Sequence, residues 1–159
     1  GNQGLSSLDA TLSIASTVGE RLLGFEEPFA AEHRELNRVL AERTDGVVYA
    51  DESVQQVEDI AAVAEHYGGI NIKLMKCGGI TPALRMISQA RKLGLKVMAG
   101  CMTESTVGIS GLCQLAPLLD YIDADGALLL AQDVADGVRF EAGQICYVQT
   151  AGTGVQIKP

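Results

Sequence analysis

Hydrophobic positions along the chain follow two alternating periods. Stretches with an apolar residue roughly every 3.6 positions predict helices over residues 5–22, 30–43, 54–66, 81–93 and 105–118. Short apolar runs lie between them and predict strands over residues 23–28, 47–53, 70–76, 95–101 and 121–126. Two further β-like runs follow, at 138–141 and 144–148. Regular alternation of helix and strand is typical of an α/β domain with a parallel sheet.

The run from Asn71 to Gly79 stands out because it places a lysine inside the predicted sheet. Period-2 alternation puts Lys73 and Met75 on one side of the strand and Ile72 on the other. The run lies between two helical patterns, so we expect a buried parallel strand. An inward lysine is costly there unless it has a partner or a function. Lys76 is expected to lie outside, near the turn that the following glycines make.

Polar residues recur where the predicted strands end, at intervals of 22 to 27 residues. Such a period matches one strand-helix unit, and charged residues on several successive strand ends favour a (β/α)8 barrel with its site at one mouth. An open doubly wound sheet is the alternative, and it would concentrate its site at one switch point. Five units are too few for a closed barrel, so the pattern predicts part of one. The recurring positions are Glu26, Asp51, Lys73, Gly100 and Asp123.

Three chemical hypotheses follow from these strand ends, each with a simpler alternative. Glu26 and Asp51 could share one Mg²⁺ ion, or be solvated loop acids. Lys73 could act as a base if burial and nearby positive charge lower its pKa, or form an ion pair with Asp51. Asp123 and Asp125 could bind an ammonium group or a second cation, or belong to an Asp-Gly turn. The residues alone leave these alternatives open.

Composition narrows the class of protein. A chain of 159 residues suits one domain, and its net charge of −8 argues against a nucleic-acid partner. No apolar run has the length of a membrane span, so no membrane partner is expected. The four cysteines form no CxxC pair, which favours a reduced, cytoplasmic protein.

Taken together, these residues resemble one family. The chain resembles the enolase superfamily, in its muconate-lactonizing-enzyme-like subgroup, and most closely the dipeptide epimerases of the L-Ala-D/L-Glu type. The resemblance covers essentially the whole chain, and for the dipeptide epimerases it depends mainly on the Asp-x-Asp pair. The motifs are Gly1–Gly4, Phe25–Pro28, Ala50–Ser53, Asn71–Gly79, Gly100–Ser105 and Asp123–Gly126.

The resemblance implies a barrel with a separate capping domain and a Mg²⁺-dependent isomerase. The reaction would be a 1,1-proton transfer at the carbon alpha to the dipeptide carboxylate, through an enediolate. The parent enzyme would be a homo-oligomer with a dipeptide substrate. The implied roles are metal ligation by Glu26 and Asp51, catalysis by Lys73, ammonium binding by Asp123 and Asp125, a pocket lined by Cys101, Met102 and Thr103, and support of the site by Asn2 and Glu104.

Two of the family's catalytic motifs are incomplete or missing in this chain. The family's first metal ligand would immediately precede Gly1, and the strand carrying the other catalytic lysine is absent. We therefore expect a C-terminal barrel portion over 1–136, from about the third helix to the eighth strand, and a tail over 137–159 that returns toward the capping domain. Alone it is expected to be inactive and marginally stable, because open sheet edges are exposed.

Two alternative functions stay open. One is another reaction of the same subgroup, namely N-acylamino acid racemisation, o-succinylbenzoate synthesis or cycloisomerisation. The Asp-x-Asp pair argues against these reactions because their substrates lack a free ammonium group. The other is a non-catalytic partial-barrel module that pairs with another chain, which would have no reason to bind Mg²⁺.

Overall fold

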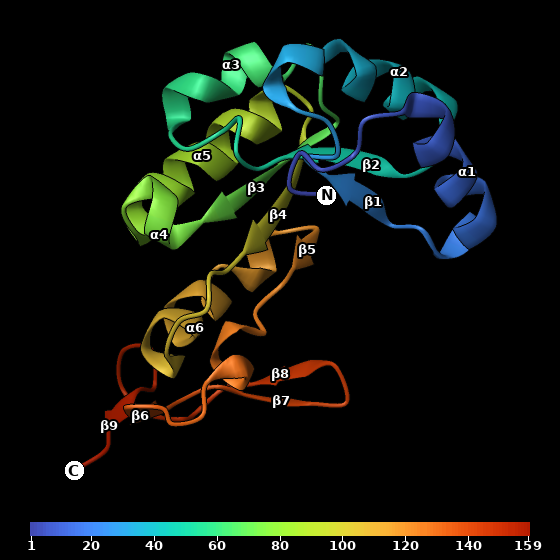
Figure 1. The fold of residues 1–159 in the computed structure, drawn as a ribbon. Helices are drawn as coiled ribbons and strands as arrows, with labels where there is room; N and C mark the ends of the chain where they lie inside the picture. The colour runs from blue at the N-terminus through green and yellow to red at the C-terminus, as the bar shows by residue number, and fades with distance from the viewer.

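The computed structural model describes residues 1–159, and its centre is a five-stranded parallel sheet (Figure 1). Every strand pairs with its neighbours in the sequence, so the order is β1-β2-β3-β4-β5 without a reversal. A doubly wound sheet would change direction at a switch point. The prediction of a partial barrel is therefore confirmed. The strands are β1 (Gly24–Glu26), β2 (Val47–Ala50), β3 (Gly69–Lys73), β4 (Lys96–Gly100) and β5 (Tyr121–Ile122).

Helices cover one face of this sheet, as Figure 1 shows for α2, α3 and α5. At the start of the first helix, the Ser7 hydroxyl accepts a hydrogen bond from the backbone nitrogen of Ala10 at 3.3 Å, as expected of an N-cap. No helix is both long enough and apolar enough to cross a membrane. The helices are α1 (Leu8–Val18), α2 (Glu35–Arg43), α3 (Ile60–Val63), α4 (Leu74–Cys77), α5 (Ile80–Lys92) and α6 (Thr106–Cys113), with 3₁₀ turns η1 (Gly19–Arg21), η2 (Ala31–His33), η3 (Val57–Asp59), η4 (Ala116–Leu118) and η5 (Gly126–Leu129).

The main core lies between the sheet and these helices. Along each strand, every second side chain faces the helices, and the intervening ones face the concave side of the sheet. On β3, Ile70 and Ile72 enter the core, so Asn71 and Lys73 take the concave face. The alternation thus delivers polar side chains to the inside of the half-barrel. Fully buried core residues include Phe29, Leu40, Val48, Ala50, Ile60, Ala83, Ala90 and Val97.

One predicted strand is shorter than expected. The strand predicted over residues 70–76 ends at Lys73, and Leu74–Cys77 form the single turn α4. The backbone nitrogen of Gly78 donates to the Leu74 carbonyl at 3.0 Å, and Gly78 ends the turn with a φ of 92°. Glycine favours this left-handed conformation at a helix end. Met75 is therefore on the helix surface, 69% exposed, and its predicted place on the strand was wrong.

The residues after β5 form two small antiparallel pairs. The predicted β-like runs form the hairpin of β7 (Arg139–Glu141) and β8 (Gln144–Cys146). A second pair, β6 (Ala135–Asp136) with β9 (Gln156–Ile157), was not predicted. These elements lie beyond α6 and away from the helix layer (Figure 1). They adjoin a second, smaller core of Ala99, Ile109, Leu112, Cys113, Ala124 and Val138.

Candidate active site

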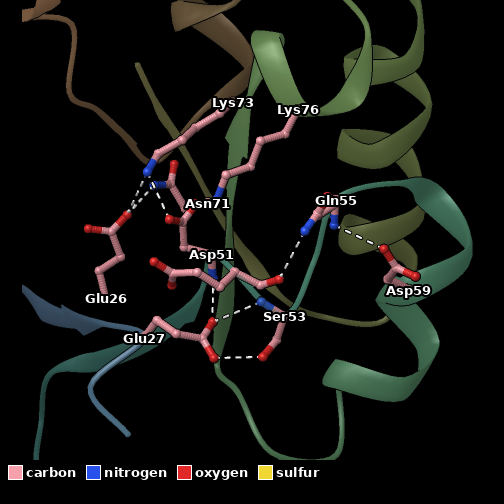
Figure 2. A network of polar contacts seen from close by, with 10 residues as sticks. Glu26, Glu27, Asp51, Ser53, Gln55, Asp59, Asn71, Lys73 and Lys76 are labelled. Atoms are coloured by element: carbon pink, nitrogen blue, oxygen red, sulfur yellow. Dashed lines mark hydrogen bonds and ion pairs between the residues drawn. The ribbon is translucent and has the colours of Figure 1, made fainter. Parts of the chain in front are cut away.

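The candidate site lies at the carboxyl ends of the parallel strands. Glu26 ends β1, Asp51 directly follows β2, Lys73 ends β3 and Asp123 directly follows β5. The carboxyl ends of parallel strands meet at one edge of a sheet, which is where α/β proteins place their sites. Figure 2 shows that the side chains of Glu26, Asp51 and Lys73 converge there. The fold thus brings together side chains that are far apart in the sequence.

Asp51 is the centre of this cluster. Its side chain is 1% exposed, and its Oδ2 atom lies 2.8 Å from the Lys73 Nζ. Its other oxygen, Oδ1, lies 2.8 Å from the Lys76 Nζ. The Lys73 Nζ also lies 3.6 Å from the Glu26 Oε1, so one ammonium group bridges two carboxylates. A buried charge needs such partners, because otherwise its desolvation is strongly unfavourable.

Lys76 is a site residue that the sequence reasoning placed incorrectly. It was expected outside the fold, but its side chain is only 21% exposed and contacts Asp51. The physical reason is α4, because residues three apart in a helical turn lie on the same side. Lys73 directly precedes that turn and Lys76 belongs to it. The signal in the sequence was the Gly78-Gly79 pair, which is typical of a helix end.

The pKa of Lys73 is raised rather than lowered in this arrangement. Burial lowers it, but the hydrogen bond to Asp51 and the charges of Asp51, Glu26 and Glu52 raise it more. The condition under which Lys73 could act as a base, a pKa lowered by burial and nearby positive charge, is therefore not met in the chain as folded. The ion pair with Asp51, the simpler alternative, is the contact that the structure contains.

A third side chain holds Glu26 in place. The Asn71 Nδ2 donates a hydrogen bond to the Glu26 Oε1, while the buried Asn71 Oδ1 has no partner. Gly100 makes room for this amide, because a Cβ atom there would lie 2.8 Å from the Asn71 Nδ2. Two carboxylates that converge on one ammonium group offer the hard oxygen donors that Mg²⁺ prefers. The residues present therefore fit a divalent cation held by Glu26 and Asp51.

A separate group of polar atoms lies where the chain leaves β4 and β5. The Cys101 sulfur and one carboxylate oxygen each from Asp123 and Asp125 lie within 4.8 Å of one another. Both aspartates are exposed, whereas Ala124 between them is buried. Burial and the charges of Asp125 and Glu26 raise the pKa of Asp123, and the charge of Lys73 opposes this. Asp123 therefore lies within electrostatic reach of the Glu26–Lys73 cluster.

Cys101 is held by the loop that follows β5. Its sulfur accepts a hydrogen bond from the Gly126 backbone nitrogen at 3.3 Å. Burial raises the pKa of the Cys101 thiol, and the charges of Asp123 and Asp125 add to this rise. A raised pKa favours the neutral thiol, so Cys101 offers an uncharged surface next to two acids.

The remaining predicted residues lie at the margin of these groups. Met102 and Thr103 are exposed on the loop after β4, and the Met102 backbone nitrogen donates to the Glu104 Oε1 at 3.1 Å. Asn2 is exposed, with a φ of 46°, and its side chain makes no hydrogen bond in the structure. Its neighbour Gln3 donates a backbone hydrogen bond to the Glu27 carbonyl at 2.7 Å. Asn2 therefore adjoins a residue that contacts the Glu27 backbone, and its side chain makes no hydrogen bond to the carboxylates of the site.

Two known proteins that are similar to this chain in sequence are both named epimerases. The chain is 50% identical over 148 residues to an L-Ala-D/L-amino acid epimerase from Flavobacterium johnsoniae, covering 91% of this chain and 44% of that protein. It is 37% identical over 155 residues to the L-Ala-D/L-Glu epimerase from Bacteroides thetaiotaomicron, covering 97% of this chain and 40% of that protein. The chain thus spans less than half the length of these relatives.

Solved structures give the same picture for the fold. A dipeptide epimerase from Methylococcus capsulatus, solved with Mg and the dipeptide L-Arg-D-Lys, superposes with a TM-score of 0.84 at 35% identity. The match covers 94% of this chain and 44% of that structure. The sequence family described as Enolase C-terminal domain-like matches residues 1–159. The chain therefore belongs to the enolase C-terminal domain-like family.

Proposed function

We propose that this chain forms part of a Mg²⁺-dependent dipeptide epimerase, an isomerase that inverts the carbon alpha to the dipeptide carboxylate. The observation that carries the proposal is the position of the Lys73 ammonium group, 2.8 Å from Asp51 and 3.6 Å from Glu26. A potential base thus adjoins two oxygen ligands. The relatives given above are all named epimerases, and these names support the choice of reaction.

Glu26 and Asp51 would hold the metal ion. When bound, Mg²⁺ would stabilise the negative charge that develops on the substrate carboxylate as the α-proton leaves, so that an enediolate becomes accessible. Asn71 orients the Glu26 carboxylate and Lys76 orients that of Asp51 through their hydrogen bonds. These contacts would fix the ligands before the substrate arrives, which is how a catalytic site avoids reorganisation during the reaction.

Lys73 would move the proton at the α-carbon on one face of the substrate. Burial favours its neutral form, and the surrounding carboxylates favour its charged form and raise its pKa on balance. A cation held by Glu26 and Asp51 would offset their charge and so favour the neutral amine that a base requires. The Lys73 side chain is 15% exposed, so bulk water has little access to the amine. A complete 1,1-proton transfer needs a second base on the opposite face, and we propose that this base lies outside residues 1–159.

Asp123 and Asp125 would bind the substrate's α-ammonium group. The two carboxylates lie close together without a basic partner, so their mutual repulsion favours a positively charged ligand. Cys101, Met102 and Thr103 would line the adjoining part of the pocket, with Glu104 supporting their loop through the Met102 amide. A free ammonium group distinguishes a dipeptide from N-acylated or cyclising substrates.

The test is Lys73→Ala in the full-length enzyme. We expect exchange of the α-proton with deuterated solvent, followed by NMR, to fall at least about 100-fold for one stereoisomer, the scale of a lost general base. Exchange of the α-proton of the other stereoisomer should continue, because the second base on the opposite face is still present. The exposed Lys92→Ala variant is the control and should exchange both at the normal rate. Retained epimerisation by Lys73→Ala would exclude Lys73 as a base.

A further inference from the structure

Glu27 is a buried carboxylate that the proposed reaction does not use. It follows Glu26 at the end of β1, and its side chain is fully buried. None of the ion pairs in the structure includes it. Its φ of 33° lies in the left-handed region, which is uncommon for a residue other than glycine. A charge buried in this way needs hydrogen bonds to compensate for the lost water.

Four donors supply that compensation. The Oε2 atom accepts the backbone N–H groups of Asp51, at 2.7 Å, and of Ser53, at 3.3 Å. The Oε1 atom accepts the hydroxyl groups of Ser53 and Tyr67, each at 2.6 Å. Figure 2 shows Glu27 lying under the Asp51–Ser53 loop, with Glu26 directed elsewhere. Glu27 therefore joins the end of β1 to the loop after β2 and to Tyr67, which only Gly68 separates from the start of β3.

The Glu27 backbone is fixed as well. Its N–H donates to the Tyr49 carbonyl at 2.8 Å, and its carbonyl accepts the Gln3 N–H at 2.7 Å. Burial raises the pKa of Tyr67, and the hydrogen bond to Glu27 raises it further, so the tyrosine stays a neutral donor. Both ends of the contact between Glu27 and the loop are thus anchored. A shift of the loop would break several hydrogen bonds at once.

We propose that Glu27 is a positioning residue, which sets the Asp51 carboxylate beside the Glu26 carboxylate by holding the Asp51 main chain. The adjacent residue, Glu26, is one proposed ligand, and the residue whose amide Glu27 binds is the other. A single side chain therefore couples the two strand ends that would share the cation. Groups that orient metal ligands in this way strongly affect metal affinity. This inference relies on the metal site in the proposed function.

The experiment compares Glu27→Ala with Glu27→Gln in the full-length protein, using Mn²⁺ as the probe and calorimetry as the readout. Glutamine keeps one oxygen for the two backbone amides, and the Ser53 and Tyr67 hydroxyls can turn to accept from its amide group. We expect Glu27→Gln to bind Mn²⁺ within about 3-fold of wild type, since the loop stays held. Glu27→Ala should lose about 10- to 100-fold in affinity.

Controls separate positioning from stability. Leu40→Ala removes a fully buried side chain of α2 outside this network, so it should lower the melting temperature without changing Mn²⁺ affinity. All titrations are made well below each variant's melting temperature. If Glu27→Ala does not fold, the double variant Ser53→Ala/Tyr67→Phe takes its place, because it leaves Oε1 without donors. That variant should lose Mn²⁺ affinity several-fold, because the Glu27 carboxylate is then free to turn and its hold on the Asp51 and Ser53 backbone amides weakens.

The outcomes distinguish this inference from the proposed function. A wild-type protein that binds no Mn²⁺ overturns the metal site itself. If Glu27→Ala or the double variant binds Mn²⁺ as tightly as the wild-type protein, only the role of Glu27 is overturned. Activity gives a further readout, because a positioning defect should raise the Mn²⁺ concentration needed for half-maximal activity in fully folded protein, whereas Leu40→Ala should leave that concentration unchanged.

Discussion

Acidic residues follow both β2 and β5 at the same edge of the sheet, but the two groups are held in different ways. Asp51 is 1% exposed, and each of its oxygens contacts a lysine. Asp123 and Asp125 are exposed, and no basic side chain forms an ion pair with them. The first carboxylate already has its counter-charges within the chain. The second pair has no ion-pair partner, and its mutual repulsion, which the charge of Lys73 only partly offsets, would be relieved by a positively charged ligand.

The difference separates two tasks. A carboxylate that must hold a metal ion in one geometry benefits from hydrogen bonds that fix it, as those of Asn71 and Glu27 do around Glu26 and Asp51. A pair that must receive and release a substrate benefits from exposure and from an unmet electrostatic demand. The predictions below test whether stability and ligand binding divide between the two groups in this way.

The largest effect is expected at Asp51. Asp51→Ala leaves the Lys73 and Lys76 ammonium groups without their shared partner, and removal of one member of a buried ion pair costs about 3–5 kcal/mol. Urea unfolding in the presence of EDTA measures this, because bound metal then makes no contribution. Asp136→Ala is the matched control, since Asp136 is 65% exposed and lies 3.5 Å from Lys158. A similar loss for both variants would contradict the comparison.

A smaller effect is expected at Lys76. Lys76→Met keeps an unbranched apolar stem but removes the ammonium group that lies 2.8 Å from the Asp51 Oδ1. Lys73 still pairs with Asp51, so we expect a loss of about 1.5 kcal/mol, the lower end of the range for a hydrogen bond to a charged group. The exposed Lys92→Met variant serves as the control in the same urea titration. If the two variants unfold alike, Lys76 does not support Asp51.

The sequence predicted the parts of the site that depend on local periodicity. Glu26, Asp51, Lys73 and Asp123 were identified because each ends or follows a strand, and the strand-helix period puts such ends at one edge. The sheet and its order followed from the same period. The strand ends and the strand order depend on local sequence, so the pattern of apolar residues predicts them.

The parts that were missed depend on a local turn or on distant contacts. Lys76 was misplaced because the strand pattern was extended through Leu74–Cys77, where the chain is helical. The role of Glu27 arises from contact with Tyr67, 40 residues away, which no local pattern indicates. Its one signal is that strand alternation directs it away from Glu26, toward the buried layer, where a charged residue is unusual. The β6–β9 pair has only two residues on each side and is equally non-local.

The smallest effect, and the one with the opposite sign, is expected at Asp123. Because its folded-state pKa is raised above the ordinary carboxyl value of 3.8, ionisation of Asp123 disfavours the folded state. Asp123→Asn should therefore stabilise the protein slightly at pH 7. The gain should shrink as the pH falls through the raised pKa, and disappear below 3.8, where the carboxyl is protonated in both states. Urea midpoints between pH 7 and about pH 3 measure the trend, with Glu65→Gln as a control that removes an exposed charge elsewhere. A loss of stability in Asp123→Asn would mean that this carboxylate has a stabilising partner within the chain, and that the exposed pair is held much as Asp51 is.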